Sequence, residues 1–202
     1  GSHIVNKYVR DDTVQRYLDE IIQRNPDLER PVTTTTCVAT HAGHAKSKLR
    51  RKTATNGDKS GARYIFHVAS VNVSPNRDQI IPVSTDDEVI ECVNNAFEKV
   101  IEVDAAQGVI SFEGCETYDD ELKGKESYQA IESIILPLFG AGRGGRAATV
   151  VIPAMVDGIK RFLLAHRNNS VIRLKDIYLC IYSKSDVDVA EQAFLTKKFN
   201  RP

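Results

Sequence analysis

A glycine-rich break between two apolar segments constrains the fold of this chain more than any other feature. Residues Ser133 to Ala148 read Ser-Ile-Ile-Leu-Pro-Leu-Phe-Gly-Ala-Gly-Arg-Gly-Gly-Arg-Ala-Ala. The apolar residues before Pro137 are typical of a buried strand, and the apolar periodicity after Arg146 is typical of a helix. The glycines between them let the backbone turn sharply and approach a ligand closely. Because the N–H groups of such a loop lead into a helix N-terminus, the stretch predicts a phosphate site.

The loop matches neither common nucleotide motif. It contains no lysine, so it is not a Walker sequence, and its Gly140-x-Gly142-x-x-Gly145 spacing follows a late strand without a preceding strand–helix–strand unit. Two arginines could add charge-assisted hydrogen bonds to a diphosphate. The alternative is a tight structural turn with solvent-facing arginines. The candidate ligand residues of the loop are Gly140, Ala141, Gly142, Arg143, Gly144, Gly145 and Arg146.

Helical and strand patterns alternate along the rest of the chain. We expect helices beginning at Asp11 or Asp12, at Ser84 or Thr85, near Ala147 and at Ser185, and strands over 30–40, 64–71, 131–138 and 174–182. Residues 72–82 are expected to form a loop, and residues 109–128 an irregular excursion with at most one short hairpin or helix. Such alternation predicts an α/β fold, a three-layer α/β/α sandwich with a mixed central sheet.

Composition narrows the class of protein. The chain has 202 residues, 42% of them hydrophobic, which suits one domain over residues 4–202 after a Gly1-Ser2-His3 remnant of an expression tag. A formal net charge of zero argues against a general nucleic-acid or anionic-membrane binder, and no apolar run has the length of a membrane helix. The four cysteines are widely spaced, which indicates reduced thiols and a cytoplasmic location.

Several segments in order resemble the macro domain family, the ADP-ribose-binding α/β/α modules. The stretch Leu136 to Gly145 looks like the family's second ligand loop, and Ala62 to Ala69 resembles its histidine-bearing strand. Residues 34–43 and 174–182 resemble two further strands of the family. The resemblance implies a three-layer macro-like domain whose ligand is ADP-ribose or an ADP-ribosylated protein, without a cofactor or a metal.

The resemblance also implies a set of ligand residues. The Gly140 to Gly145 backbone would hold the diphosphate and distal ribose, Ser70, Val71 and Asn72 would line the same cleft, and Tyr182 would pack on adenine. For Tyr182 the alternative is an ordinary aromatic residue at a strand end. Two features of the family have no counterpart: the Asn-Ala-Ala-Asn first ligand loop and the early acidic residue that reads adenine. Gly144 also stands where many members carry an aromatic residue.

Three functions follow from these patterns. The first is binding of ADP-ribose or an ADP-ribosylated protein. The second is an ADP-ribosyl hydrolase, for which no catalytic residue is assigned because the supporting loop is not identifiable. The third is a degenerate macro-like protein-interaction module. His67 is expected to be a core histidine, and His41 and His44 are expected to be surface residues of a turn rather than metal ligands.

Overall fold

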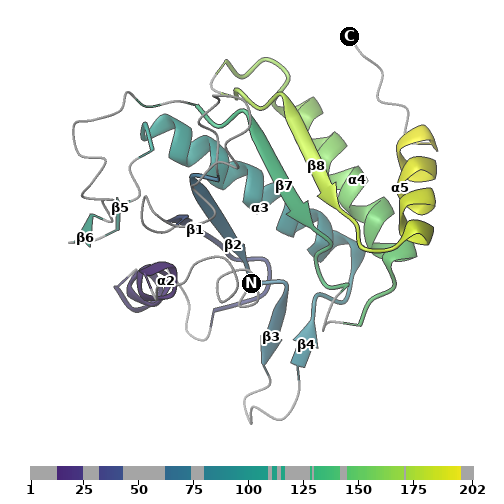
Figure 1. Cartoon of the computed structure of the whole chain (residues 1–202), viewed down its shortest axis with the longest axis horizontal. Coiled ribbons are helices and arrows are strands. Elements are labelled where there is room, and N and C mark those ends of the chain that lie inside the picture. Colours follow the sequence, from purple (N-terminus) through teal and green to yellow (C-terminus); the bar gives the residue numbers. More distant parts are fainter. Residues whose placement is uncertain are drawn as a thin grey trace, which may run out of the picture.

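The structure is a computed structural model that describes residues 13–24, 32–42, 62–73, 80–108, 111–112, 115–116, 128, 130–141, 145–170 and 172–196. The elements are, in chain order, α2 (Thr13–Arg24), β1 (Cys37–His41), β2 (Tyr64–Val68), β3 (Val71–Val73), β4 (Ile80–Pro82), α3 (Asp86–Ala105), β5 (Ser111–Phe112), β6 (Cys115–Glu116), β7 (Ser133–Pro137), α4 (Ala148–Ala165), β8 (Asp176–Cys180) and α5 (Lys184–Thr196). Figure 1 shows their arrangement. The fold is α/β, as the sequence predicts. None of the described helices is both long and apolar enough to cross a bilayer.

The strands pair two by two. β7 and β8 are parallel, with Ser133 opposite Asp176 and Pro137 opposite Cys180, whereas β1–β2, β3–β4 and β5–β6 are antiparallel. Within the described residues these pairs form four separate two-stranded sheets rather than the single mixed central sheet expected from the sequence. A parallel pair needs a crossover connection, which α4 provides between β7 and β8.

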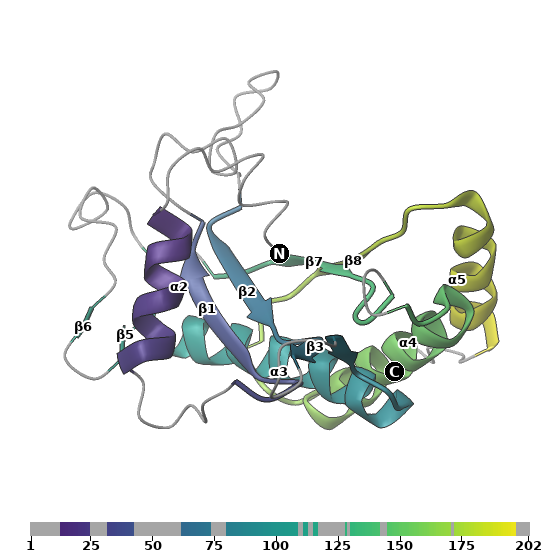
Figure 2. The same cartoon turned by 90° about the horizontal axis from the view of Figure 1, so that it is seen from below.

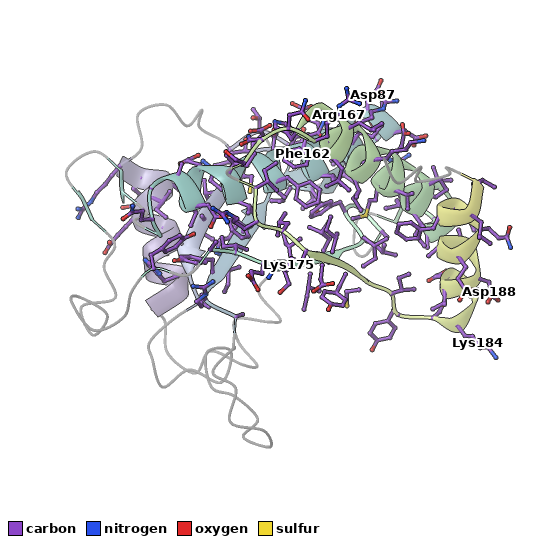
Figure 3. All side chains as sticks on the ribbon, turned by 90° about the horizontal axis from the view of Figure 1, so that it is seen from above. Asp87, Phe162, Arg167, Lys175, Lys184 and Asp188 are labelled. Carbon is purple, nitrogen blue, oxygen red and sulfur yellow. The ribbon has the colours of Figure 1, made fainter. Side chains whose placement is uncertain are left out.

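Helices α3 and α4 form the layer against which the longer strands pack. One core cluster joins side chains of both helices to inward-facing residues of β1, β2, β7 and β8, including Ala39, Phe66, Ile134 and Leu179. The two helices approach closely at Gly158, where an added Cβ would lie 3.3 Å from the Ile90 Cα. Phe162 lies inside this layer, stacked between Phe97 and His166 (Figure 3).

The two longest strand pairs are covered differently. All five residues of β1 are buried, because both α2 and α3 pack against this strand (Figure 2). In β7, by contrast, burial alternates: Ile134 and Leu136 face the core, while the Ile135 side chain is 69% exposed. The described residues therefore cover one face of the β7–β8 pair. Alternation of buried and exposed side chains is typical of a half-buried sheet.

Local sequence signals explain most element boundaries. Thr85 begins α3 as the predicted N-cap, and its hydroxyl accepts the Glu88 N–H while the Glu88 carboxylate accepts the Thr85 N–H. α3 ends at Ala105, and just beyond its C-cap Gln107 and Gly108 both have positive φ. A proline within a helical pattern predicts a kink or a shifted helix start. α4 begins at Ala148 and continues through Pro153.

Five expectations about local structure are wrong. The strand predicted over 64–71 ends at Val68, and the predicted loop over 72–82 contains the β3–β4 pair, in which Asn72 lies opposite Ile81. His41 is not a surface turn residue: it lies in β1, 7% exposed, with its ring centroid 5.4 Å from that of Tyr64. His44 lies outside the described residues.

The other two corrections concern helix α4 and the start of α5. The apolar periodicity after Arg146 predicts that Val150 faces inward, but its side chain is 43% exposed in the first turn of α4. The cap of α5 is Ser183 rather than Ser185, since the Ser183 hydroxyl accepts the Asp186 N–H at 3.2 Å. Capping depends on the backbone position just before the first helical residue, which the spacing of serines alone does not determine.

Candidate functional site

The candidate site lies where the parallel strands β7 and β8 end. Each strand runs into a short connection and then into a helix, β7 into α4 and β8 into α5 (Figure 1). Because the strands are parallel, both connections emerge at the same edge of the sheet. In open α/β sheets this carboxyl edge is where ligands usually bind.

The connection after β7 folds back on itself. The Ala141 N–H donates to the Leu138 carbonyl oxygen at 3.3 Å, and the Arg146 N–H donates to the Gly140 carbonyl oxygen at 3.2 Å. Gly140 and Gly145 have φ values of 78° and 73°, a left-handed conformation that glycine adopts at little cost. The loop from Gly140 to Arg146, which we call the glycine loop, therefore closes just before α4 begins.

The N-terminus of α4 is the one among α3, α4 and α5 that has no side-chain cap. Its N-cap residue is Ala147, whose extended backbone has φ −66° and ψ 137°. The Ala147 carbonyl oxygen accepts the N–H groups of Val150 and Val151, but the side chain offers no acceptor. The first N–H groups of a helix have no intrahelical acceptor and carry a partial positive charge. The end of the glycine loop thus leads into a helix terminus that can receive an anion.

Ser70 and the glycine loop lie against the same buried residue, Val83. The Ser70 carbonyl oxygen accepts the Val83 N–H at 3.1 Å, and Val83 is fully buried. A Cβ added to Gly140 would lie only 2.7 Å from the Val83 Cγ2. The predicted residues Ser70 and Gly140 therefore flank the same valine, and Val71, 39% exposed, follows Ser70 into β3.

Tyr182 lies just after the other strand of the parallel pair. It follows β8, and its side chain is fully exposed. Its neighbour Ile181 packs in a second core cluster, defined by Ile152, Val156, Ala190 and Ala193, that also receives Leu138 and Ala148. Leu138 precedes Gly140 by two residues, and Ala148 begins α4. Tyr182 therefore stands at the same sheet edge as the glycine loop.

The middle of the loop, Gly142, Arg143 and Gly144, lies outside the described residues, so the predictions for these three residues stay predictions. Arg146 is described, and its guanidinium is engaged by protein groups. Its Nη1 donates to the Thr85 carbonyl oxygen at 2.8 Å, and its Nη2 donates to Asp86 Oδ1 at 2.7 Å.

Sequence reasoning missed the residues that hold the loop from outside. Val83 and Asp86 come from the segment before and at the start of α3, some sixty residues from the partners they contact. The sequence does signal the helix start at Thr85, through its acidic first turn. No local pattern indicates that this helix start lies against the glycine loop.

Three titratable groups in β1, β2 and α3 are in structural rather than reactive environments: His67, Cys37 and Cys92. His67 shares a 2.9 Å hydrogen bond with the buried Thr40 hydroxyl, and burial lowers the pKa of His67 to about 4, as expected for a core histidine. Burial raises the pKa of the Cys37 and Cys92 thiols to about 12, so both are protonated near neutral pH and are poor nucleophiles. The described residues contain no group of three or more His, Cys, Asp or Glu side chains arranged to hold a metal ion.

A separate apolar hollow of about 420 Å³ lies between α4 and α5. Its lining residues are Pro153, Asp188, Val189, Gln192, Ala193 and Thr196. Figure 3 shows Asp188 and Lys184 on α5. None of the predicted ligand residues that the structure describes lines this hollow.

Comparison with known proteins gives a distant structural likeness. No family model and no curated protein matches the sequence. Among solved structures, the chain is similar to a macrodomain of Trypanosoma brucei in complex with ADP, with 13% sequence identity and a TM-score of 0.47. The similarity covers 80% of this chain and 46% of that chain, so this chain spans less than half of that protein's length.

Proposed function

We propose that this chain binds ADP-ribose, free or attached to a protein, with the diphosphate at the junction of the glycine loop and α4. The observation that carries this proposal is the uncapped N-terminus of α4, positioned at the carboxyl edge of a parallel strand pair. The N–H groups of Ala148 and Thr149 lie in the first helical turn, where N–H groups have no intrahelical acceptor. A phosphate group supplies both the acceptors and the negative charge that this position favours.

The residues on either side of the glycine loop would contact the remaining parts of the ligand. Tyr182 is fully exposed at the same sheet edge and offers an aromatic face on which adenine would stack. Ser70, whose carbonyl oxygen accepts the Val83 N–H, and Val71 next to it in sequence would form the opposite boundary of the same site. The macro-like sequence pattern is what supports one domain over residues 4–202 with the three-layer sandwich of that family.

Replacing Ala147 tests the proposal, because it separates ligand binding from folding. In Ala147→Asp, the new carboxylate caps α4 and occupies the position proposed for the phosphate. N-capping side chains stabilise a protein by about 0.5–2 kcal/mol relative to alanine. We therefore expect the free energy of unfolding to rise by about 1 kcal/mol, while affinity for ADP-ribose in a calorimetric titration falls at least about tenfold, the factor that corresponds to 1.4 kcal/mol.

The matched control is Ala147→Asn, which caps the helix without adding charge. It should stabilise the chain to a similar degree and weaken ADP-ribose binding less than Ala147→Asp does. If Ala147→Asp is stabilised and still binds ADP-ribose with unchanged affinity, the phosphate does not lie at this helix terminus. If the unchanged chain shows no heat with millimolar ADP-ribose, the binding function itself is wrong.

A further inference from the structure

The last residue of the glycine loop is tied to the start of α3 rather than pointing freely into the site. Arg146 donates from two separate nitrogens, to the Thr85 carbonyl oxygen at 2.8 Å and to Asp86 Oδ1 at 2.7 Å. Its side chain is only 15% exposed, and its Cδ lies 3.7 Å from the position of a Cβ on Gly140. The arginine therefore runs along the loop before reaching α3.

The two acceptors of the Arg146 guanidinium, on Thr85 and Asp86, are themselves held in place. Thr85 is the N-cap of α3, and Glu88 closes the capping box by accepting the Ser84 and Thr85 N–H groups at 2.7 and 2.9 Å. These backbone hydrogen bonds lower the pKa of the Glu88 carboxyl group, first through Ser84 and then through Thr85. The box keeps the Thr85 carbonyl and the Asp86 carboxylate at a defined place, so they act as an anchor for the loop.

We propose that Arg146 is a positioning residue for the diphosphate site, which shapes the glycine loop through Thr85 and Asp86 and does not contact the ligand itself. This inference rests on the proposed binding of ADP-ribose. The Arg146 backbone N–H closes the loop on the Gly140 carbonyl while its guanidinium closes the loop on α3. With the Asp86 carboxylate beside it, the guanidinium adds little net charge to the site, so backbone N–H groups make the main contacts with the phosphates.

Substitution of Asp86 separates this role from direct contact. If Arg146 bound the phosphates and Asp86 merely competed for it, Asp86→Asn would free the arginine and strengthen ADP-ribose binding. For a positioning residue, Asp86→Asn and Arg146→Gln both weaken ADP-ribose binding, by about fivefold or more, because hydrogen bonds to charged groups contribute about 1.5–3 kcal/mol. The double variant should then bind about as weakly as the weaker single variant, since both changes weaken the same connection between the glycine loop and α3.

Arg146→Lys provides the matched control for charge. Lysine keeps the positive charge but lacks the planar fork that reaches two acceptors. We expect Arg146→Lys to bind ADP-ribose as weakly as Arg146→Gln, although it keeps the charge of the unchanged chain. Stronger binding in Asp86→Asn, or full affinity in Arg146→Lys, would overturn the positioning role.

Amide hydrogen exchange gives a readout that needs no ligand. Loss of the connection should speed exchange of the Arg146 amide, which donates to Gly140, by about tenfold or more, as local opening becomes easier. If that exchange accelerates in Asp86→Asn but the unchanged chain does not bind ADP-ribose, the loop connection is right and the proposed function is wrong. If the unchanged chain binds and the Arg146 amide exchanges at the same rate in all variants, the positioning role is refuted on its own.

Discussion

The packing of Gly140 against Val83 makes a quantitative prediction about the glycine loop. In Gly140→Ala the new Cβ would lie 2.7 Å from the Val83 Cγ2, at a backbone φ of 78°. The left-handed conformation costs a residue with a side chain about 1–2 kcal/mol, and forcing a methyl group into a packed site costs about 1–3 kcal/mol more. Because Val83 is fully buried, it has little room to move away. We therefore expect the free energy of unfolding to fall by about 2–5 kcal/mol.

Gly145 provides a matched control within the same loop. Its φ is 73°, but nothing lies within 4 Å of an added Cβ, so Gly145→Ala should cost only the backbone share of about 1–2 kcal/mol. Urea denaturation of both variants measures the difference. In a Val83→Ala background, which removes the clashing methyl, Gly140→Ala should cost about as much as Gly145→Ala. Equal costs for the two glycines with Val83 intact would refute the reasoning.

Three further predictions follow from other parts of the molecule. Burial lowers the pKa of His67 to about 4 from 6.5, so the unfolded chain binds a proton at a higher pH than the folded chain does, and the free energy of unfolding should fall by about 3 kcal/mol as the pH drops from 6.5 to 4. In His67→Gln the urea midpoint should lose this part of its pH dependence, and a pH profile equal to that of the unchanged chain would contradict the assignment. Gly158→Leu should destabilise the chain by at least about 2 kcal/mol, because even a Cβ at this position would lie 3.3 Å from the Ile90 Cα. Thermal unfolding at the same midpoint as the unchanged chain would show that α3 and α4 are not in close contact. Tyr182→Ala should change the free energy of unfolding by no more than about 0.5 kcal/mol, because the side chain is fully exposed. In calorimetric titrations it should bind ADP-ribose about tenfold more weakly than Tyr182→Phe, and equal affinities for both variants would show that Tyr182 is not part of the site.

The sequence predicts elements whose signals are local. The α3 N-terminus can be predicted because Thr85 and Glu88 have capping-box spacing and the first turn is acidic. β7 and β8 are readable as short apolar runs, and their parallel pairing follows from the helix between them. The expectation for His67 also holds, since a histidine within an apolar strand usually finds a partner, here Thr40.

The sequence does not predict features that depend on contacts between distant residues. His41 looks like a turn residue next to a glycine, but pairing with β2 places it opposite Tyr64 and buries it. Arg146 looks like a phosphate ligand because it flanks a glycine loop, and only the tertiary structure shows that Asp86 and Thr85 already occupy its guanidinium. Likewise, nothing local distinguishes Val83 from other apolar residues, although its methyl group decides which side chain is tolerated at position 140.

Backbone amide chemical shifts during a titration with ADP-ribose test the central claim most directly. If the diphosphate binds where the glycine loop meets α4, the amides of Gly145, Ala148 and Thr149 should show the largest shifts and saturate with one affinity. Amides in the hollow between α4 and α5, such as that of Gln192, should move less. No shifts at millimolar ADP-ribose, or shifts centred on Gln192 while the α4 N-terminus stays unchanged, would contradict the account.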